Sequence, residues 1–166
     1  MFRDLPPGLP MAPLDLALSH LMRGVATRHP SILRRLGAHG GARVLIDVTD
    51  APVLLLMEPA LRRLTAHRRT RPPRASATIR GRLAAFLAML HGTEDGDALF
   101  FSGDLEIGGD TAAVLALRNA LDDAELDLTE ELAAIGGPAG ALLRRASASI
   151  TRRTGLVLTR QQGDAT

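Results

Sequence analysis

The side chains that could do acid–base or metal chemistry are scattered along this chain. Glu94, Asp95 and Asp97 lack the ligand ladder of a calcium loop, so we expect them to form a solvated acidic loop. Ser102 lies outside any nucleophile-elbow pattern. The histidines fall at no metal-binding spacing: His20, His29, His39, His67 and His91. These patterns predict no catalytic residue, no metal site and no enzymatic activity.

The amino-acid composition narrows the class of protein further. The 166 residues suit a single domain, 46% of them are hydrophobic, and only 2% are aromatic. There is no cysteine and no lysine, so every strong base is arginine, which can grip a phosphate with two donors. The sequence has neither a run of about 18 apolar residues nor a signal-peptide pattern. We expect a cytoplasmic protein, either free or on the inner face of the membrane.

Hydrophobic periodicity predicts the elements that position these groups. Helices are expected over 13–25, 31–36 and 83–91, after Asp110, after Asp127, and from Pro138 to about Arg153. Strands are expected at 43–49, 53–57, 61–68, 75–80 and 105–107. Strands joined by short turns favour an α+β fold, in which helices pack on one side of a mostly antiparallel sheet.

Three of the four phenylalanines lie between Phe86 and Phe101. The segment from Asp97 to Thr111 is expected to hold a tight loop with the adjacent Phe100 and Phe101, then a short strand, then a Gly-Gly-Asp-Thr turn. Asp110 is well placed to cap the following helix, and its negative charge argues against phosphate binding there. Aromatic side chains this rare indicate a packing or ligand-lining role.

A basic stretch has no acidic residue between Glu58 and Glu94. These charges either solvate a sheet edge and block aggregation or contact an anionic partner such as phospholipid headgroups. Stacking aromatics are missing from the stretch, so no nucleic acid is expected. Its arginines are Arg62, Arg63, Arg68, Arg69, Arg71, Arg74, Arg80 and Arg82.

The last predicted helix has a narrow apolar stripe of Leu142, Leu143, Ala146 and Ile150. Either the stripe packs on the sheet, or the basic helix lies in a membrane interface. Its arginines, Arg144, Arg145, Arg152 and Arg153, lie outside the stripe or at its margins.

One motif makes the chain resemble sterol carrier protein type 2-like domains, and among them the UbiT-like accessory factors of oxygen-independent ubiquinone biosynthesis. The resemblance covers about residues 13–135, leaving a Pro-rich arm (1–12) and a basic helix with a tail (136–166). The motif comprises Asp97, Leu99, Phe100, Phe101, Leu105, Ile107, Gly109, Asp110 and Thr111, and the helix that follows runs through Asp122 and Leu126.

The resemblance implies a five-stranded sheet covered by helices around a hydrophobic lipid tunnel. It also implies binding of isoprenoid quinone intermediates and acidic phospholipids, with no cofactor, beside UbiU- and UbiV-like iron–sulfur hydroxylation proteins. Gly103-Asp104 departs from the family, whose members are often more basic at that place.

On this basis we expect two groups of binding residues. The lipid tunnel would be lined by Phe86, Leu87, Leu90, Phe100, Phe101, Leu105, Ile107, Val114, Leu117 and Leu121. Anionic headgroups would meet Arg62, Arg63, Arg68, Arg69, Arg71, Arg74, Arg144, Arg145, Arg152 and Arg153. A general phospholipid or fatty-acyl carrier, and a regulatory module with an Arg-rich anion-binding surface, remain open alternatives.

Overall fold

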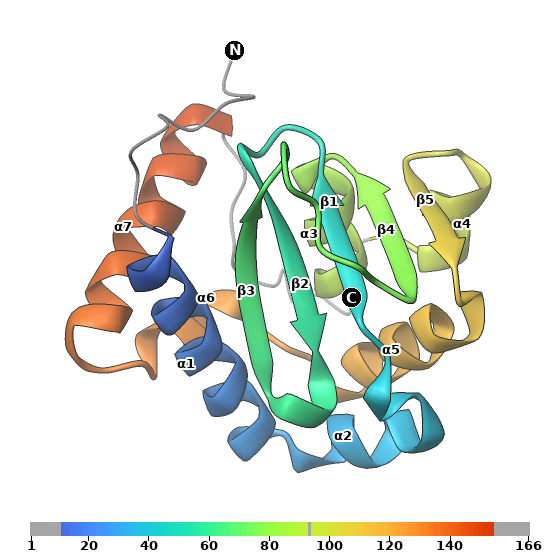
Figure 1. The fold of residues 1–166 in the computed structure, drawn as a ribbon, viewed down its shortest axis with the longest axis horizontal. Helices are drawn as coiled ribbons and strands as arrows, with labels where there is room; N and C mark the ends of the chain where they lie inside the picture. Colours follow the sequence, from blue (N-terminus) through green and yellow to red (C-terminus); the bar gives the residue numbers. More distant parts are fainter. Residues whose placement is uncertain (1–10, 93, 155–166) are drawn as a thin grey trace, which may run out of the picture.

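A five-stranded sheet forms the centre of the fold (Figure 1). The computed structural model describes residues 11–92 and 94–154. In spatial order the strands are β3 (Arg63–Arg68), β2 (Val53–Glu58), β1 (Val44–Val48), β4 (Ala77–Gly81) and β5 (Leu105–Gly109). Among these described strands, only β1 and β4 pair in parallel. The expected α+β fold with a mostly antiparallel sheet is confirmed.

The link between β3 and β4 explains the single parallel pair. Because β3 is an edge strand and β4 lies beyond β1, residues 69–76 must pass across β2 and β1. Figure 1 shows this crossover on the face of the sheet turned toward the viewer. It covers part of the face opposite the main helices.

The helices cover the other face. They are α1 (Ala12–Arg28), α2 (Pro30–Leu36), α3 (Leu83–His91), α4 (Gly96–Phe101), α5 (Thr111–Ala124), α6 (Leu128–Ala133) and α7 (Gly137–Thr154), with short 3-10 turns at Gly37–Gly41 and Pro59–Leu61. Helix α1 packs on β3, and α5 packs on α2 and on β4 and β5. Helix α7 packs against α1 and α6, beyond the β3 edge (Figure 1).

The predicted loop around Asp97 and the paired phenylalanines is wrong, because Gly96–Phe101 is the helix α4. Its first turn is capped by Asp95, whose carboxylate accepts a hydrogen bond from the Asp97 amide at 3.0 Å. Leu99 anchors the helix in the protein interior, because this residue is only 3% exposed. Six residues are too few to show a helical period, so the acidic composition suggested a loop.

The Gly109-Asp110-Thr111 turn joins β5 to α5 as expected. The Asp110 carboxylate accepts a hydrogen bond from the Ala113 amide at 3.1 Å, which confirms the predicted cap. Gly109 has φ of +74°, and a Cβ there would lie 2.4 Å from the Ser76 carbonyl oxygen. Glycine is required at this turn because β4 passes so close to it.

Candidate functional site

The helix-facing side of the sheet gathers most of its apolar side chains. Strand side chains alternate between faces, and directly paired residues share a face. The register therefore places Ile46 between Leu55 of β2 and Ile79 of β4, with Ile107 of β5 beyond Ile79. Four strands thus contribute one continuous apolar row beneath the helices.

Two separate clusters pack on this face. The first cluster lies under α3, α4 and α5 and contains Leu36, Val44, Ala77, Ile79, Ala85, Leu99, Leu105, Val114 and Leu117. The second cluster lies under α1 and contains Ala17, Leu18, Ala66 and Ile135. The helices thus cover the two halves of the sheet with distinct groups of side chains.

An apolar seam, defined here as Ile46, Leu55 and Met57, runs where the two clusters meet. Ile46 and Met57 border the first cluster and Leu55 borders the second, yet all three are only half-buried. They belong to interior strands, where a filled interface between sheet and helices would bury them. On the opposite face of β2, Leu56 is 2% exposed. The helices therefore leave the middle of the sheet partly accessible.

Seven of the ten expected lipid-lining residues come together at the first cluster. Leu105, Val114 and Leu117 are buried members of it. Those packed against it are half-buried: Phe86, Phe100, Ile107 and Leu121. This group supplies the apolar wall that continues from the seam toward β5.

The other three expected lining residues lie elsewhere. Leu90 packs against a third cluster formed by Ile32, Ala120 and Leu126. Leu87 is buried on α3. Phe101 points to solvent and is 92% exposed. The adjacent phenylalanines therefore face different ways, because neighbouring positions of a helix cannot share one face.

Sequence reasoning missed the seam itself. The alternation of Val44, Ile46 and Val48 gives one face of β1, but strand order is needed to show that Leu55 and Met57 share that face. The apolar run of β2 was the other sequence feature that pointed to the seam, because both faces of this strand are apolar. Strand register therefore reveals the candidate site, and composition alone does not.

The acidic residues before α4 hold an arginine. Arg118 of α5 is 15% exposed at its side chain and lies among three carboxylates. The distances are 2.5 Å from Nη1 to Asp97 Oδ1, 3.5 Å from Nε to Asp122 Oδ2 and 3.6 Å from Nη2 to Asp95 Oδ1. Asp95 and Asp97 are exposed to solvent, as expected, and through Arg118 they also join α4 to α5.

Two arginines at one end of the sheet are neutralised by a buried carboxylate. Arg63 Nε donates to Glu58 Oε2 at 2.8 Å, and Arg43 Nε donates to Glu58 Oε1 at 3.2 Å. The hydrogen bond from Arg63 is the main cause that lowers the pKa of Glu58; burial opposes it, and the charges of Arg63 and Arg43 lower the pKa further. The same bond raises the pKa of Arg63. Arg63 is thus engaged within the fold.

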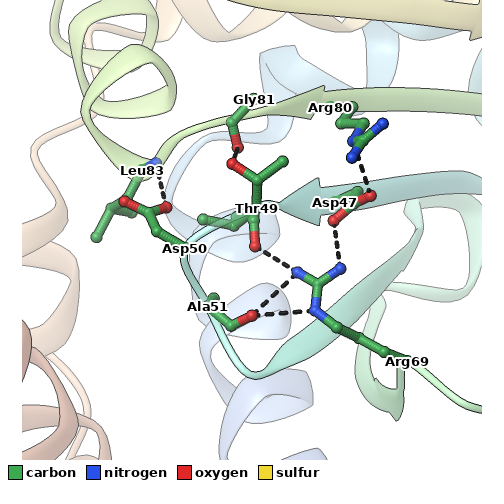
Figure 2. Close-up of polar contacts among 9 residues, drawn as sticks. Asp47, Thr49, Asp50, Ala51, Arg69, Arg80, Gly81 and Leu83 are labelled. Atoms are coloured by element: carbon green, nitrogen blue, oxygen red, sulfur yellow. Dashed lines mark hydrogen bonds and ion pairs between the residues drawn. The ribbon is translucent and has the colours of Figure 1, made fainter. Parts of the chain in front are cut away.

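Arg69 acts as a clamp at the opposite end of the sheet (Figure 2). Its guanidinium donates to Asp47 Oδ1 at 2.7 Å and to the carbonyl oxygens of Val48 and Ala51. Asp47 also pairs with Arg80, at 3.4 Å. Nearby, the Asp50 carboxylate accepts a bond from the Leu83 amide at the start of α3. Arg69 therefore fastens β3 to the β1–β2 turn.

The remaining expected arginines differ in exposure. Arg62, Arg71 and Arg74 are exposed, while Arg68 is half-buried and engaged in a contact. On α7, Arg145 is exposed and Arg144 donates to the Ile135 carbonyl oxygen at 2.9 Å. Arg152 Nε donates to the Ala148 carbonyl oxygen at 3.4 Å. The side chains of Arg153, Leu143, Ala146 and Ile150 lie outside the described residues.

Within residues 11–92 and 94–154, no three His, Asp or Glu side chains come together as a metal site. One of the histidines, His29, instead contacts the buried Glu131, with 2.6 Å between Nε2 and Oε1. None of the described helices is long and apolar enough to cross a bilayer.

Comparison with known families agrees with this geometry. Residues 21–122 match the profile described as "SCP-2 sterol transfer family". The chain belongs to the SCP-2 family. No curated protein matches the sequence. The matched range includes every described strand and the helices α2 to α4, so the seam and all nine residues of the first cluster lie within the SCP-2 domain.

Solved structures share the SCP-2 fold at low sequence identity. "UbiJ-SCP2 Ubiquinone synthesis protein" has a TM-score of 0.50 and 20% identity, over 74% of this chain and 97% of that one. The sterol carrier protein domain 2 of Helicoverpa armigera has a TM-score of 0.50 and 11% identity, over 73% of this chain and 95% of that one. The matches extend over nearly the whole of both neighbours.

Proposed function

We propose that this SCP-2 protein is a non-enzymatic lipid-binding accessory factor that holds an isoprenoid quinone intermediate and presents it to partner hydroxylases in oxygen-independent ubiquinone biosynthesis. The observation that carries the lipid role is the half-buried seam of Ile46, Leu55 and Met57 on interior strands. An aliphatic guest would lie along the seam and against the first cluster.

The physical reason for such a carrier is the insolubility of the prenyl tail. Removing each CH₂ group from water contributes about 0.8 kcal/mol, so a polyprenyl chain leaves the membrane only when a protein encloses it. The wall around the seam is made of aliphatic side chains and Phe86 and Phe100. Such a wall suits a hydrocarbon tail and offers no chemistry to it.

The quinone assignment has its own support. The sequence motif from Asp97 to Thr111 resembles UbiT-like accessory factors, and one neighbour of the same fold is named a ubiquinone synthesis protein. UbiU- and UbiV-like iron–sulfur proteins are the partners that this resemblance implies. A general phospholipid or fatty-acyl carrier is the second candidate, and the family description of sterol transfer favours it.

Peripheral membrane contact completes the proposal. Arg62, Arg71 and Arg74 are exposed, and two of them flank the Pro72-Pro73 pair in the crossover. Each such charge near an anionic bilayer contributes about 1 kcal/mol. The basic crossover would hold the protein at the cytoplasmic surface of the membrane, from which the lipid is taken.

Organic extraction of the purified protein, followed by mass spectrometry, tests the function. Prenyl-phenols or prenyl-quinones at near-stoichiometric amounts support the quinone role, and phospholipids or fatty acids alone support the general carrier. The wild type and Ile46→Trp are each titrated with a prenyl-phenol and with a fatty acid. Binding within the seam should be lost in Ile46→Trp, whereas adhesion of lipid to the protein surface should not. No extracted lipid and no saturable binding would refute both lipid roles.

A further inference from the structure

Helix α4 divides its side chains sharply between the interior and solvent. Leu99 is buried in the first cluster and Phe100 packs against that cluster, whereas Phe101 is 92% exposed. A helix of six residues has little stability of its own. Its position therefore depends on Leu99, on Phe100 and on what fastens its outer side.

Arg118 is the fastening on that side. Its guanidinium contacts Asp95 and Asp97 at the start of α4 and Asp122 on its own helix α5. The packing is close, because a Cβ on Gly96 would lie 2.6 Å from Arg118 Nε. Gly96 is itself buried. A single arginine thus joins the first turn of α4 to α5 by charge and by contact.

Glycines lie on both sides of the helix. Gly92 ends α3 with φ of +65°, and Gly103 follows α4 with φ of +82°. Other residues rarely adopt these angles, and glycine moves between them and its other conformations at low cost. The backbone can therefore turn at both positions while α3 and β5 stay in place.

We propose that α4 is a lid over the first cluster and that Arg118 is the positioning residue that holds it closed. Turning α4 outward about Gly92 and Gly103 would lift Leu99 and Phe100 away from the rest of the cluster. That movement opens the apolar wall at the β5 end, where a lipid tail would enter. The inference rests on the proposed function for its purpose, while the movement itself can be measured without any lipid.

A single tryptophan reports the lid directly, because the chain has no Trp or Tyr. Phe100→Trp places an inner probe on the side of α4 that faces the first cluster, and Phe101→Trp places an outer probe on the side that faces solvent. Adding Arg118→Gln should shift the emission of the inner probe to longer wavelength and increase its quenching by acrylamide, while the outer probe stays unchanged. Arg35→Gln is the matched control, since it removes an equal charge from the Arg35–Asp123 pair between α2 and α5.

Two further variants separate opening from unfolding. Asp95→Asn with Asp97→Asn removes two exposed carboxylates, leaves Arg118 in place, and should reproduce the shift of the inner probe. Arg118→Lys keeps the charge and should restore part of the protection from acrylamide that the inner probe has with the original arginine. If the inner probe is quenched equally with Arg118 intact, with Arg118→Gln and with the double Asn change, α4 is a fixed wall and the lid is refuted.

Lipid release gives the second measurement. Transfer of a pyrene-labelled fatty acid from the protein to phosphatidylcholine vesicles should be about threefold to tenfold faster in Arg118→Gln, the range expected when a partly buried ion cluster is lost. Saturable binding with an unchanged release rate refutes the lid and leaves the proposed function standing. Absence of lipid binding, with a shift of the inner probe, refutes the proposed function and leaves the lid standing.

Discussion

Ile46 of β1 and Ile79 of β4 are directly paired in the parallel part of the sheet and face the same side, yet they differ in burial. Ile79 is 4% exposed beneath the helices, while Ile46 is half-buried. On the other side of Ile46, its partner Leu55 is also half-buried. At this position along the strands, the close packing under α3 and α5 therefore ends between Ile79 and Ile46, and the seam begins at Ile46.

Enlarging these two residues should destabilise the protein to different extents. Ile46→Trp fills accessible space, so it should lower the free energy of unfolding by less than about 1 kcal/mol and abolish lipid binding. Ile79→Trp overpacks a filled site and should lower it by about 1–3 kcal/mol. Urea unfolding and fatty-acid titration measure both effects. Equal destabilisation by the two variants would mean that the seam is as tightly packed as its neighbour.

The two faces of α4 predict a second contrast. Leu99→Ala should lower the free energy of unfolding by about 2–5 kcal/mol, because the side chain is buried in the first cluster. Phe101→Ala should change it by no more than about 0.5 kcal/mol, because the ring lies in solvent. Thermal unfolding checks both. A large loss at Phe101 would show that the ring packs against the protein.

The basic residues should separate into structural and surface groups. Arg69→Gln removes the clamp on Asp47, Val48 and Ala51 and should lower the free energy of unfolding by about 1.5–3 kcal/mol. The double variant Arg71→Gln, Arg74→Gln should leave stability unchanged and weaken binding to phosphatidylglycerol vesicles roughly thirtyfold at low salt.

The double variant Arg23→Gln, Arg34→Gln is the control for vesicle binding. It removes the same charge from exposed positions on α1 and α2, away from the crossover. Vesicle flotation against rising salt measures all of these variants. Equal weakening by the two double variants would indicate a general charge effect in place of a docking surface on the crossover.

Glu58 predicts a dependence of stability on pH. Its arginine partners lower its pKa in the folded protein below the ordinary value of 4.5. The unfolded state therefore binds the proton first as the pH falls, so the stabilisation present above about pH 4.5 is lost on acidification through the folded pKa. Glu58→Gln should flatten the decline of unfolding free energy below that pH. Glu106→Gln, at an exposed position of β5, should not.

Much of the fold could be predicted from the sequence because the strong periodic signals are local. The alternation in β1 and the helical spacing in α3 depend only on neighbouring residues, and the Asp110 cap depends on one side chain and one turn. The elements that could not be predicted depend on contacts with distant parts of the chain. Six residues gave no period for α4, and its Asp95 cap looked like part of an acidic loop.

The candidate site was harder to predict for a related reason. Whether an apolar residue fills a core or lines an accessible seam depends on the distance to elements far along the chain, as Ile46 and Ile79 illustrate. Phe101 resembled Phe100 in the sequence, but their places on a short helix separate them. Arg69 looked like its exposed neighbours until strand order brought Asp47 next to it.

Methyl NMR of the isoleucine side chains tests the central claim most directly, because Ile46 and Ile107 border the first cluster and Ile32 belongs to the third. Titration with a prenyl-phenol should shift the Ile46 and Ile107 methyl signals and give ligand contacts to them. Ile32, buried in the third cluster, should stay unchanged. If saturating ligand leaves Ile46 and Ile107 unshifted, the apolar seam does not hold the lipid.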